Sequence, residues 1–215
     1  MGDFPVLDGQ LFLFQGDSIT DCGRRAASAP FGGGYPSIFI ERMTAAFPER
    51  KVRYINKGIS GDRVTGLRDR WEDDVIRHQP DWVSILIGIN DLHGFLRDPA
   101  NGVSVETYRE RYDSILATTR EKTGANLLLL DPFYISLDRE TGQSFRSTVL
   151  DIIPQYIAVV HEMAAKYNAC HLKTHELFQQ HLQYREAEAF CPEPVHPNHT
   201  GHMVIADAMM RVLAG

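Results

Sequence analysis

The chain has 215 residues, of which 43% are hydrophobic and 23% charged, a composition typical of a soluble globular protein. Its net charge is −6 and basic residues form no run, which argues against a nucleic-acid-binding surface. No apolar stretch approaches the roughly 18 residues that a membrane span needs. The first residues, Met1–Asp8, include an early acid and lack the basic segment of a signal peptide. We therefore expect one cytoplasmic domain over residues 1–215, with neither membrane nor nucleic acid as a partner.

Three cysteines stand at wide spacings and form no CxxC pair: Cys22, Cys170 and Cys191. Their odd number argues against a disulfide framework, and we expect reduced and mostly buried thiols, as in cytoplasmic proteins.

Extended and helical patterns alternate along the whole chain. In chain order, we predict a strand at Leu11–Phe14, a helix at Tyr35–Phe47, a strand at Val52–Asn56, a helix at Val64–Val75, a strand at Trp82–Ile87, a helix starting near Ser104, a strand at Ala125–Leu130, a helix at Phe145–Tyr167, a strand at Cys170–Lys173 and a helix at Thr200–Leu213. Pro154 predicts a kink or restart in the fourth of these helices. Trp71 lies on a helical core stripe and Trp82 starts a strand, so both are expected in the core. The alternation predicts a parallel, doubly wound α/β sheet with helices on both faces.

The segment Phe14–Asp21 is the most informative part of the sequence. Gly16 allows a sharp turn after the first strand, so that Ser18 would lie at the carboxyl end of the sheet, where α/β folds bind ligands. A serine there can present its hydroxyl and its backbone N–H to a substrate. Ser and Asp are also common turn and N-cap residues, so a purely structural role is the alternative. Asp17 and Asp21 are expected to cap and brace this loop.

Three further segments stand at similar places in the predicted fold: Lys57–Gly61 after the second strand, Ile87–Asp91 after the third, and Glu193–Pro197 before the last helix. With the Ser18 segment, they resemble the four sequence blocks of the SGNH (GDSL-type) hydrolase family, in the same order. This resemblance covers Leu11 to Gly201. It implies a flavodoxin-like three-layer sandwich with a five-stranded parallel sheet, and ester hydrolysis by a serine nucleophile without a cofactor.

The resemblance also implies the roles of the site residues. Ser18 would be the nucleophile, and it needs a base because a serine hydroxyl attacks poorly until its proton is removed. We assign that role to His196, whose neighbours Val195 and Pro197 hold it in a rigid loop. Glu193 would orient the imidazole, although the family usually has Asp at this position; a solvated surface acid is the alternative.

Two further residues complete the implied oxyanion hole. The backbone N–H groups of Ser18 and Gly61 and the side-chain amide of Asn90 would donate to the oxyanion of acyl transfer. The alternatives are a plain turn glycine at Gly61 and an Asx-turn at Asn90.

The remaining histidines give little indication of a metal site. Six are expected at the surface: His78, His93, His161, His171, His175 and His181. His196, His199 and His202 follow one another at three-residue steps, but no cysteine or carboxylate cluster completes a coordination shell around them, so we predict no metal.

Across its length, the sequence resembles the bacterial intracellular acetylxylan esterases of this superfamily. The segments that carry this resemblance are Gly16–Arg24, Asn56–Gly61, Arg70–Asp74, Pro80–Ser84 and Asp131–Tyr134. It implies an acetylated xylo-oligosaccharide as substrate and a homo-oligomer. A broad short-chain carboxylesterase, or a lysophospholipase or thioesterase, is the alternative enzyme. A non-catalytic carbohydrate- or flavin-binding module is a third possibility, but Asp17 and Asp21 would repel the phosphate of a flavin.

Overall fold

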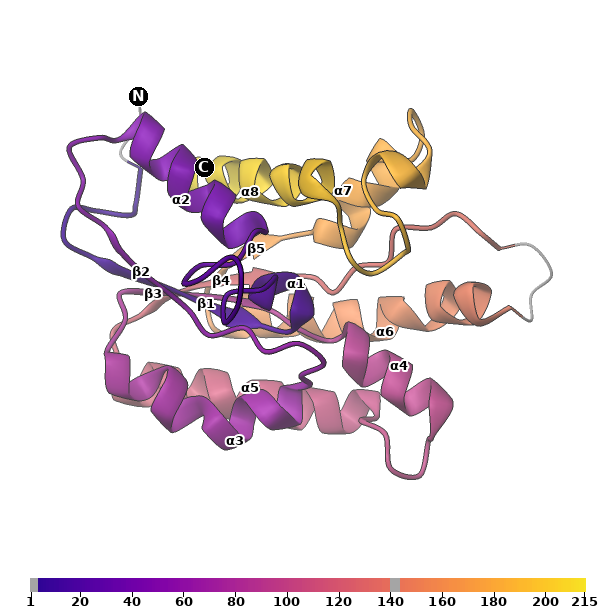
Figure 1. The fold of residues 1–215 in the computed structure, drawn as a ribbon. Coiled ribbons are helices and arrows are strands. Elements are labelled where there is room, and N and C mark those ends of the chain that lie inside the picture. Colours follow the sequence, from indigo (N-terminus) through magenta and orange to yellow (C-terminus); the bar gives the residue numbers. More distant parts are fainter. Residues whose placement is uncertain (1–3, 140–143) are drawn as a thin grey trace.

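The computed structural model describes residues 4–139 and 144–215, and a parallel five-stranded sheet lies at its centre (Figure 1). The strands are β1 (Leu11–Gly16), β2 (Arg53–Asn56), β3 (Trp82–Leu86), β4 (Asn126–Leu130) and β5 (Cys170–Leu172). Their order across the sheet is β2-β1-β3-β4-β5, and every neighbouring pair is parallel. All five strands were predicted within two residues of these bounds, and the doubly wound α/β prediction is confirmed.

Helices cover both faces of this sheet and give the predicted three-layer arrangement. They are α1 (Ser18–Asp21), α2 (Tyr35–Ala46), α3 (Val64–Asp74), α4 (Ile89–Arg97), α5 (Val105–Lys122), α6 (Phe145–Lys166), α7 (Thr174–His181) and α8 (His199–Ala214), with short 3-10 turns η1 (Ile76–His78) and η2 (Ala187–Ala189). Helices α2 and α8 pack together on one face, and α3, α5 and α6 lie on the other (Figure 1). Within the described ranges, no helix combines the length and the apolar character needed to cross a lipid bilayer.

The core explains why the central strands are so apolar. Every residue of β1 and β3 is buried, whereas β2 and β5 at the sheet edges are partly open to solvent. Phe12 and Phe14 of β1 pack on Phe39 of α2, with ring centroids 5.0 and 5.8 Å apart. Fully burying one such side chain stabilises the fold by about 1.5–3 kcal/mol. Trp71 and Trp82 are buried in the core, as predicted.

Helix α6 contains Pro154 in its interior. We expected a kink or a restart there; the helix does not restart, since the chain forms one helix from Phe145 to Lys166. A proline cannot donate the backbone hydrogen bond to the carbonyl of Leu150, four residues earlier. The Arg139 guanidinium lies 3.5 Å from that carbonyl oxygen and donates to it instead, so the helix continues with its acceptor partly satisfied.

Candidate active site

The site begins at the end of β1, where the chain turns into α1. A Cβ atom at Gly16 would collide with the Leu86 carbonyl oxygen and the Thr20 side chain, so only glycine fits between the strand and this turn. Asp17 caps α1, its carboxylate accepting the Ile19 N–H at 3.0 Å, as predicted. Ser18 is therefore the first residue of α1 and lies half-buried at the carboxyl end of the sheet.

Three of the predicted residues lie in hydrogen-bond contact. Ser18 Oγ is 2.8 Å from His196 Nε2, and His196 Nδ1 is 2.5 Å from Glu193 Oε1. Both ring nitrogens of His196 are thus engaged, and the carboxylate selects the tautomer with the proton on Nδ1. The side chains of His196 and Glu193 are 57% and 46% exposed, so a substrate can reach the imidazole from solvent.

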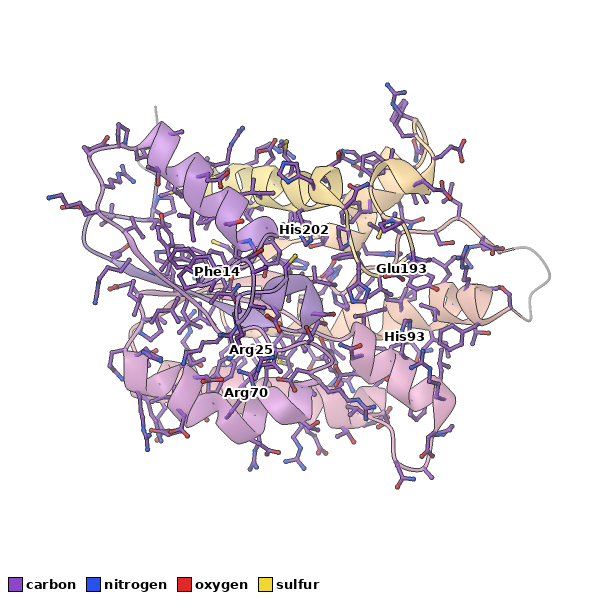
Figure 2. The ribbon with its side chains drawn as sticks, in the orientation of Figure 1. Phe14, Arg25, Arg70, His93, Glu193 and His202 are labelled. Carbon is purple, nitrogen blue, oxygen red and sulfur yellow. The ribbon has the colours of Figure 1, made fainter. Side chains whose placement is uncertain are left out.

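The loop before α8 accommodates the longer glutamate side chain by folding the carboxylate back over its own backbone. Glu193 Oε1 accepts the His196 backbone N–H at 2.7 Å, and Oε2 accepts the Val195 N–H at 3.1 Å. The loop is fixed from the other side by the Ile135 N–H, which donates to the Pro194 carbonyl at 2.8 Å. Figure 2 labels Glu193 on this loop. The folded-back side chain therefore accommodates the extra methylene of Glu193 within this loop.

The segment after β2 lies next to the Ser18 turn. The Ile59 N–H donates to the Gly16 carbonyl at 3.0 Å, which ties the two loops together. Gly61 has φ +80°, a conformation that favours glycine, and its position is exposed. Asn90, in the first turn of α4, donates one amide hydrogen to the Asp62 carbonyl at 3.1 Å. The second amide hydrogen of Asn90 can therefore be offered to a ligand, since an amide has two donors.

Arg70 of α3 holds the segment after β2 in place, and we assigned it no role from the sequence. Its Nε and Nη2 donate to Asp62 Oδ2 at 2.9 and 2.7 Å, and its Nη1 donates to the Lys57 carbonyl at 2.9 Å. Nη2 also reaches Gln15 Oε1 of β1 at 3.0 Å, and Nη1 pairs with Asp74 (Figure 2). The sequence indicated Arg70 only as part of the segment Arg70–Asp74. A guanidinium has five donors, and the sequence does not show which acceptors the fold brings to them.

Two fully buried carboxyl groups, those of Asp17 and Asp91, lie in the segments that contain Ser18 and Asn90. Burial raises the pKa of Asp17 to about 7, with a further increase from Asp62 that the Ile19 hydrogen bond opposes. Burial likewise raises the pKa of Asp91 to about 7, although its Oδ1 accepts the Val64 N–H at 3.0 Å.

Asp21 behaves in the opposite way and braces the loop as predicted. Its Oδ2 accepts both the N–H and the hydroxyl of Ser60 at 3.0 Å. Partial burial acts to raise the pKa of Asp21, but the Ser60 bonds and Arg25 outweigh it and lower the pKa. The Ser60 loop is therefore held by an ionised carboxylate, next to Gly61.

A pocket of about 240 Å³ opens beside the loop before α8, and Cys191, Pro192, Glu193 and Pro194 of this loop line it. Charged side chains from two parts of the chain line it together with the loop: Asp138, Arg146, Arg185, Glu186 and Glu188. The pocket is therefore polar where it meets the loop, and it contacts Glu193 and Pro194 directly.

The histidines differ from the prediction in two respects. Of the six expected at the surface, only His161 is exposed, and the other five are half-buried. The expectation failed because helical spacing does not show what packs on a ring from another element. The trio at three-residue steps is spread over separate environments: His196 contacts Ser18, whereas His202 accepts the Tyr35 N–H on Nδ1 at 3.1 Å. Burial lowers the pKa of His202 to about 4, so this ring is neutral.

The thiols fit only partly with expectation. All three cysteines are free, as predicted, but only Cys191 is fully buried. Burial, with the charge of Glu193 nearby, raises the pKa of Cys191 to about 12. This thiol, two residues before Glu193, is therefore protonated and not a nucleophile at neutral pH.

Comparison with known proteins identifies the family of the chain. Residues 14–204 match the model of the GDSL-like Lipase/Acylhydrolase family. An acetylxylan esterase from Geobacillus stearothermophilus is 35% identical over 213 residues, covering 94% of this chain and 93% of that protein. The crystal structure of Axe2, an acetylxylan esterase from the same organism, superposes with a TM-score of 0.86 at 35% identity, covering 97% of this chain and 95% of that one.

A second solved structure is similar to the same extent. LAE5, an alpha/beta hydrolase enzyme from the metagenome of Lake Arreo in Spain, has a TM-score of 0.86 at 29% identity and covers 97% of this chain and 96% of its own. With the family match over nearly the whole length, these likenesses establish the class of the protein. The chain belongs to the GDSL-like lipase/acylhydrolase family and is a carboxylic ester hydrolase.

Proposed function

We propose that the enzyme removes acetyl groups from xylo-oligosaccharides through an acyl-enzyme on Ser18. The observation that carries the catalytic part is the continuous contact from Ser18 Oγ to His196 Nε2 at 2.8 Å and from His196 Nδ1 to Glu193 at 2.5 Å. This is the geometry in which a base accepts the hydroxyl proton while a carboxylate holds the imidazole.

In the first half of the reaction, Ser18 Oγ attacks the ester carbonyl carbon and its proton passes to His196 Nε2. The sugar oxygen then leaves with that proton, and the acetyl group remains on Ser18. In the second half, His196 removes a proton from water, the resulting hydroxide attacks the acetyl carbon, and acetate leaves as Ser18 recovers its proton. Glu193 stays ionised and offsets the imidazolium charge during both halves.

The oxyanion of each tetrahedral intermediate needs donors, and we assign them to the Ser18 N–H, the Gly61 N–H and the free amide hydrogen of Asn90. Support comes from the hydrogen bonds that tie the three segments together, from Ile59 to Gly16 and from Asn90 to Asp62. Donors fixed in this way need no reorganisation when charge develops, and one of them is typically worth about 3–4 kcal/mol in the transition state.

The spacing of residues in Axe2 supports Glu193 as the third residue. Solved catalytic mutants of Axe2 replace a serine, an aspartate or a histidine by alanine, and the aspartate stands three positions before the histidine. Glu193 stands three positions before His196 in this chain. The spacing is the same and only the length of the acid differs, which the folded-back carboxylate accommodates.

The substrate assignment draws on two observations. The similar proteins are acetylxylan esterases, and one variant structure is described as an acetyl-xylooligosaccharide esterase. The pocket against Glu193 is lined by charged side chains, which suit the hydroxyl groups of a sugar better than a long acyl chain. A broad short-chain carboxylesterase remains the alternative activity, because a small acetyl ester places few demands on the acyl side.

We also propose that the enzyme is a cytoplasmic homo-oligomer. The three free thiols fit a reducing compartment. Several large apolar side chains are exposed and available for contacts between copies: Leu7, Leu137, Phe145, Tyr184 and Met203. Light scattering after size-exclusion chromatography measures the mass, and a monomer at micromolar concentration would contradict the assembly.

Two substrate series test the proposed reaction. The first compares kcat/KM for nitrophenyl acetate, butyrate and octanoate, and we expect it to fall with chain length. The second measures acetate release from acetylated xylobiose and acetylated xylose, with Ser18→Ala as the control for background hydrolysis. No acetate release from either sugar, together with hydrolysis of nitrophenyl acetate, would favour the alternative short-chain carboxylesterase. A higher kcat/KM for octanoate would contradict both and favour a lysophospholipase or thioesterase.

A further inference from the structure

A carboxylate and two imidazoles meet at the end of β4. Asp131 directly follows the strand, and its side chain is 2% exposed. Its Oδ2 lies 3.1 Å from His161 Nε2 of α6, and its Oδ1 lies 2.7 Å from His171 Nε2 of β5. The three ligand atoms all lie within 4.8 Å of one another, and this is the one such group of His, Cys, Asp and Glu within residues 4–139 and 144–215.

The fold brings these residues together across long distances in the sequence. Strands β4 and β5 are neighbours in the sheet, with Leu129 in register with His171, so His171 lies beside the start of the loop that holds Asp131. Helix α6 crosses the same strands and places the His161 ring edge-on to the His171 ring, with centroids 4.5 Å apart. Each ligand therefore comes from a different structural element.

The donor set is one that divalent transition metals prefer. Zn²⁺ binds imidazole nitrogen and carboxylate oxygen at about 2.0–2.2 Å, which sets tetrahedral ligand atoms roughly 3.3 Å apart. The oxygen–nitrogen distances of 2.7 and 3.1 Å need to open only slightly to admit an ion. Each imidazole would then carry its proton on Nδ1 and bind the ion through Nε2.

Room for a further ligand exists next to this cluster. A pocket of about 320 Å³ is bordered by Asp131 and His161, and also by His175 and Glu176. Because the His161 side chain is 42% exposed, an ion can enter from solvent on this side. Water in this pocket can occupy the fourth coordination position.

We propose that Asp131, His161 and His171 bind one divalent transition-metal ion of the Zn²⁺ class, and that this ion fastens α6 and β5 to the end of β4. The site stabilises the fold and takes no part in the proposed esterase reaction, which uses none of these three residues. The competing explanation is that the two imidazoles only donate hydrogen bonds to a buried carboxylate. The two explanations differ in whether the cluster has affinity for a metal.

The experiment titrates Zn²⁺ into the full-length protein after treatment with EDTA and dialysis, using isothermal calorimetry and thermal unfolding. We expect one equivalent of Zn²⁺ to bind per chain and to raise Tm, since a ligand that binds only the folded state stabilises it. His161→Ala removes the most exposed ligand and is expected to keep the fold. It should weaken Zn²⁺ binding by more than the roughly 10- to 100-fold that loss of an outer-shell partner costs.

Two further variants sharpen the result. His78→Ala removes a half-buried histidine outside the cluster and should bind Zn²⁺ like the natural chain. Asp131→Asn keeps the size of the buried side chain while removing its charge, and should also weaken binding. Absence of Zn²⁺ binding, or equal affinity in His161→Ala and His78→Ala, would overturn the proposed site. Esterase activity is measured in parallel and should not change with EDTA, so failure of the metal site and failure of the proposed reaction are distinguishable.

Discussion

Glu193 accepts two hydrogen bonds from the same residue, one from the His196 backbone N–H at 2.7 Å and one from the ring Nδ1 at 2.5 Å. The backbone bond positions the carboxylate, and the ring bond orients the imidazole toward Ser18. A residue one methylene longer than the usual family aspartate thus reaches the same nitrogen without displacing the histidine.

This relationship predicts the effects of two substitutions. Glu193→Gln removes the charge that offsets the imidazolium, so we expect kcat to fall about 10²- to 10⁴-fold with little change in KM. Glu193→Asp restores the family residue in a loop shaped for a longer side chain, and it should retain more activity than Glu193→Gln. Steady-state kinetics with nitrophenyl acetate measure both. If Glu193→Gln and Glu193→Ala both keep the natural kcat, the enzyme works with Ser18 and His196 alone.

Ser18→Ala separates catalysis from stability. The hydroxyl is half-buried and contacts only the exposed His196 ring, so its loss should change Tm by no more than a few degrees. Activity should fall by about 10⁴-fold or more, because the nucleophile itself is removed. Differential scanning fluorimetry and acetate release give the two values, and residual activity of several per cent would exclude Ser18 as the nucleophile.

Arg70 is predicted to act on catalysis by holding the segment that contains Gly61. Arg70→Met removes the donors to Asp62, Lys57 and Gln15, and it leaves Asp62 without its cation. Because a small displacement of an aligned donor costs up to about 100-fold in rate, we expect a clear loss in kcat. Some loss of stability should accompany it, since the substitution leaves the partly buried carboxylate of Asp62 without this cation.

The control for Arg70 is Arg68 on the same helix, an exposed side chain paired only with its neighbour Asp69 at 3.4 Å. Arg68→Met should leave kcat and Tm unchanged. Equal kinetics for the Arg68 and Arg70 variants would show that the Arg70 network has no influence on the oxyanion donors.

Burial of Asp91 predicts how stability depends on pH. The folded pKa is raised to about 7, against about 3.9 in the unfolded chain, so the folded state holds an extra proton between these values. The free energy of unfolding should therefore fall as pH rises from about 4 to 7, by about 1.4 kcal/mol per pH unit for this one proton. Asp91→Asn imitates the protonated acid and lacks this dependence.

Urea unfolding of both proteins between pH 4 and 8 checks this prediction. His202 has a lowered pKa and acts in the opposite direction, so the useful quantity is the difference between the variant and the natural chain. That difference should grow in favour of Asp91→Asn as pH rises from about 4 to 7 and then level off. A difference that stays constant with pH would mean that Asp91 is ionised in the folded protein.

The sequence predicted the sheet well and the surroundings of the site less well. Strands β1 and β3 are buried on both faces, and their continuous apolar runs are visible in the sequence itself. Helix α4 was missed, because Asn90, Asp91 and Gly94 are residues that favour turns over helices. Tertiary packing on α6 outweighs that local preference.

The contacts that link distant segments were beyond local patterns. Four motifs indicated which segments come together at the site. The acceptors of Arg70 and the partners of His161 and His171 depend instead on strand order and helix placement. Both histidines were expected at the surface. His161 of α6 is exposed and His171 of β5 is half-buried, and both contact Asp131, which no local pattern indicated. Such contacts become predictable only once the neighbours in the sheet are known.

The most direct test of the central claim is labelling with an alkyl fluorophosphonate followed by peptide mapping. Such a reagent reacts with a serine hydroxyl that a neighbouring base has activated, and the mapped adduct names the residue. We predict one adduct per chain, on Ser18, lost in His196→Ala because the proton acceptor is gone. An adduct on Ser28, Ser37 or Ser60, or labelling of Ser18 that is unchanged in His196→Ala, would contradict the proposed catalytic site.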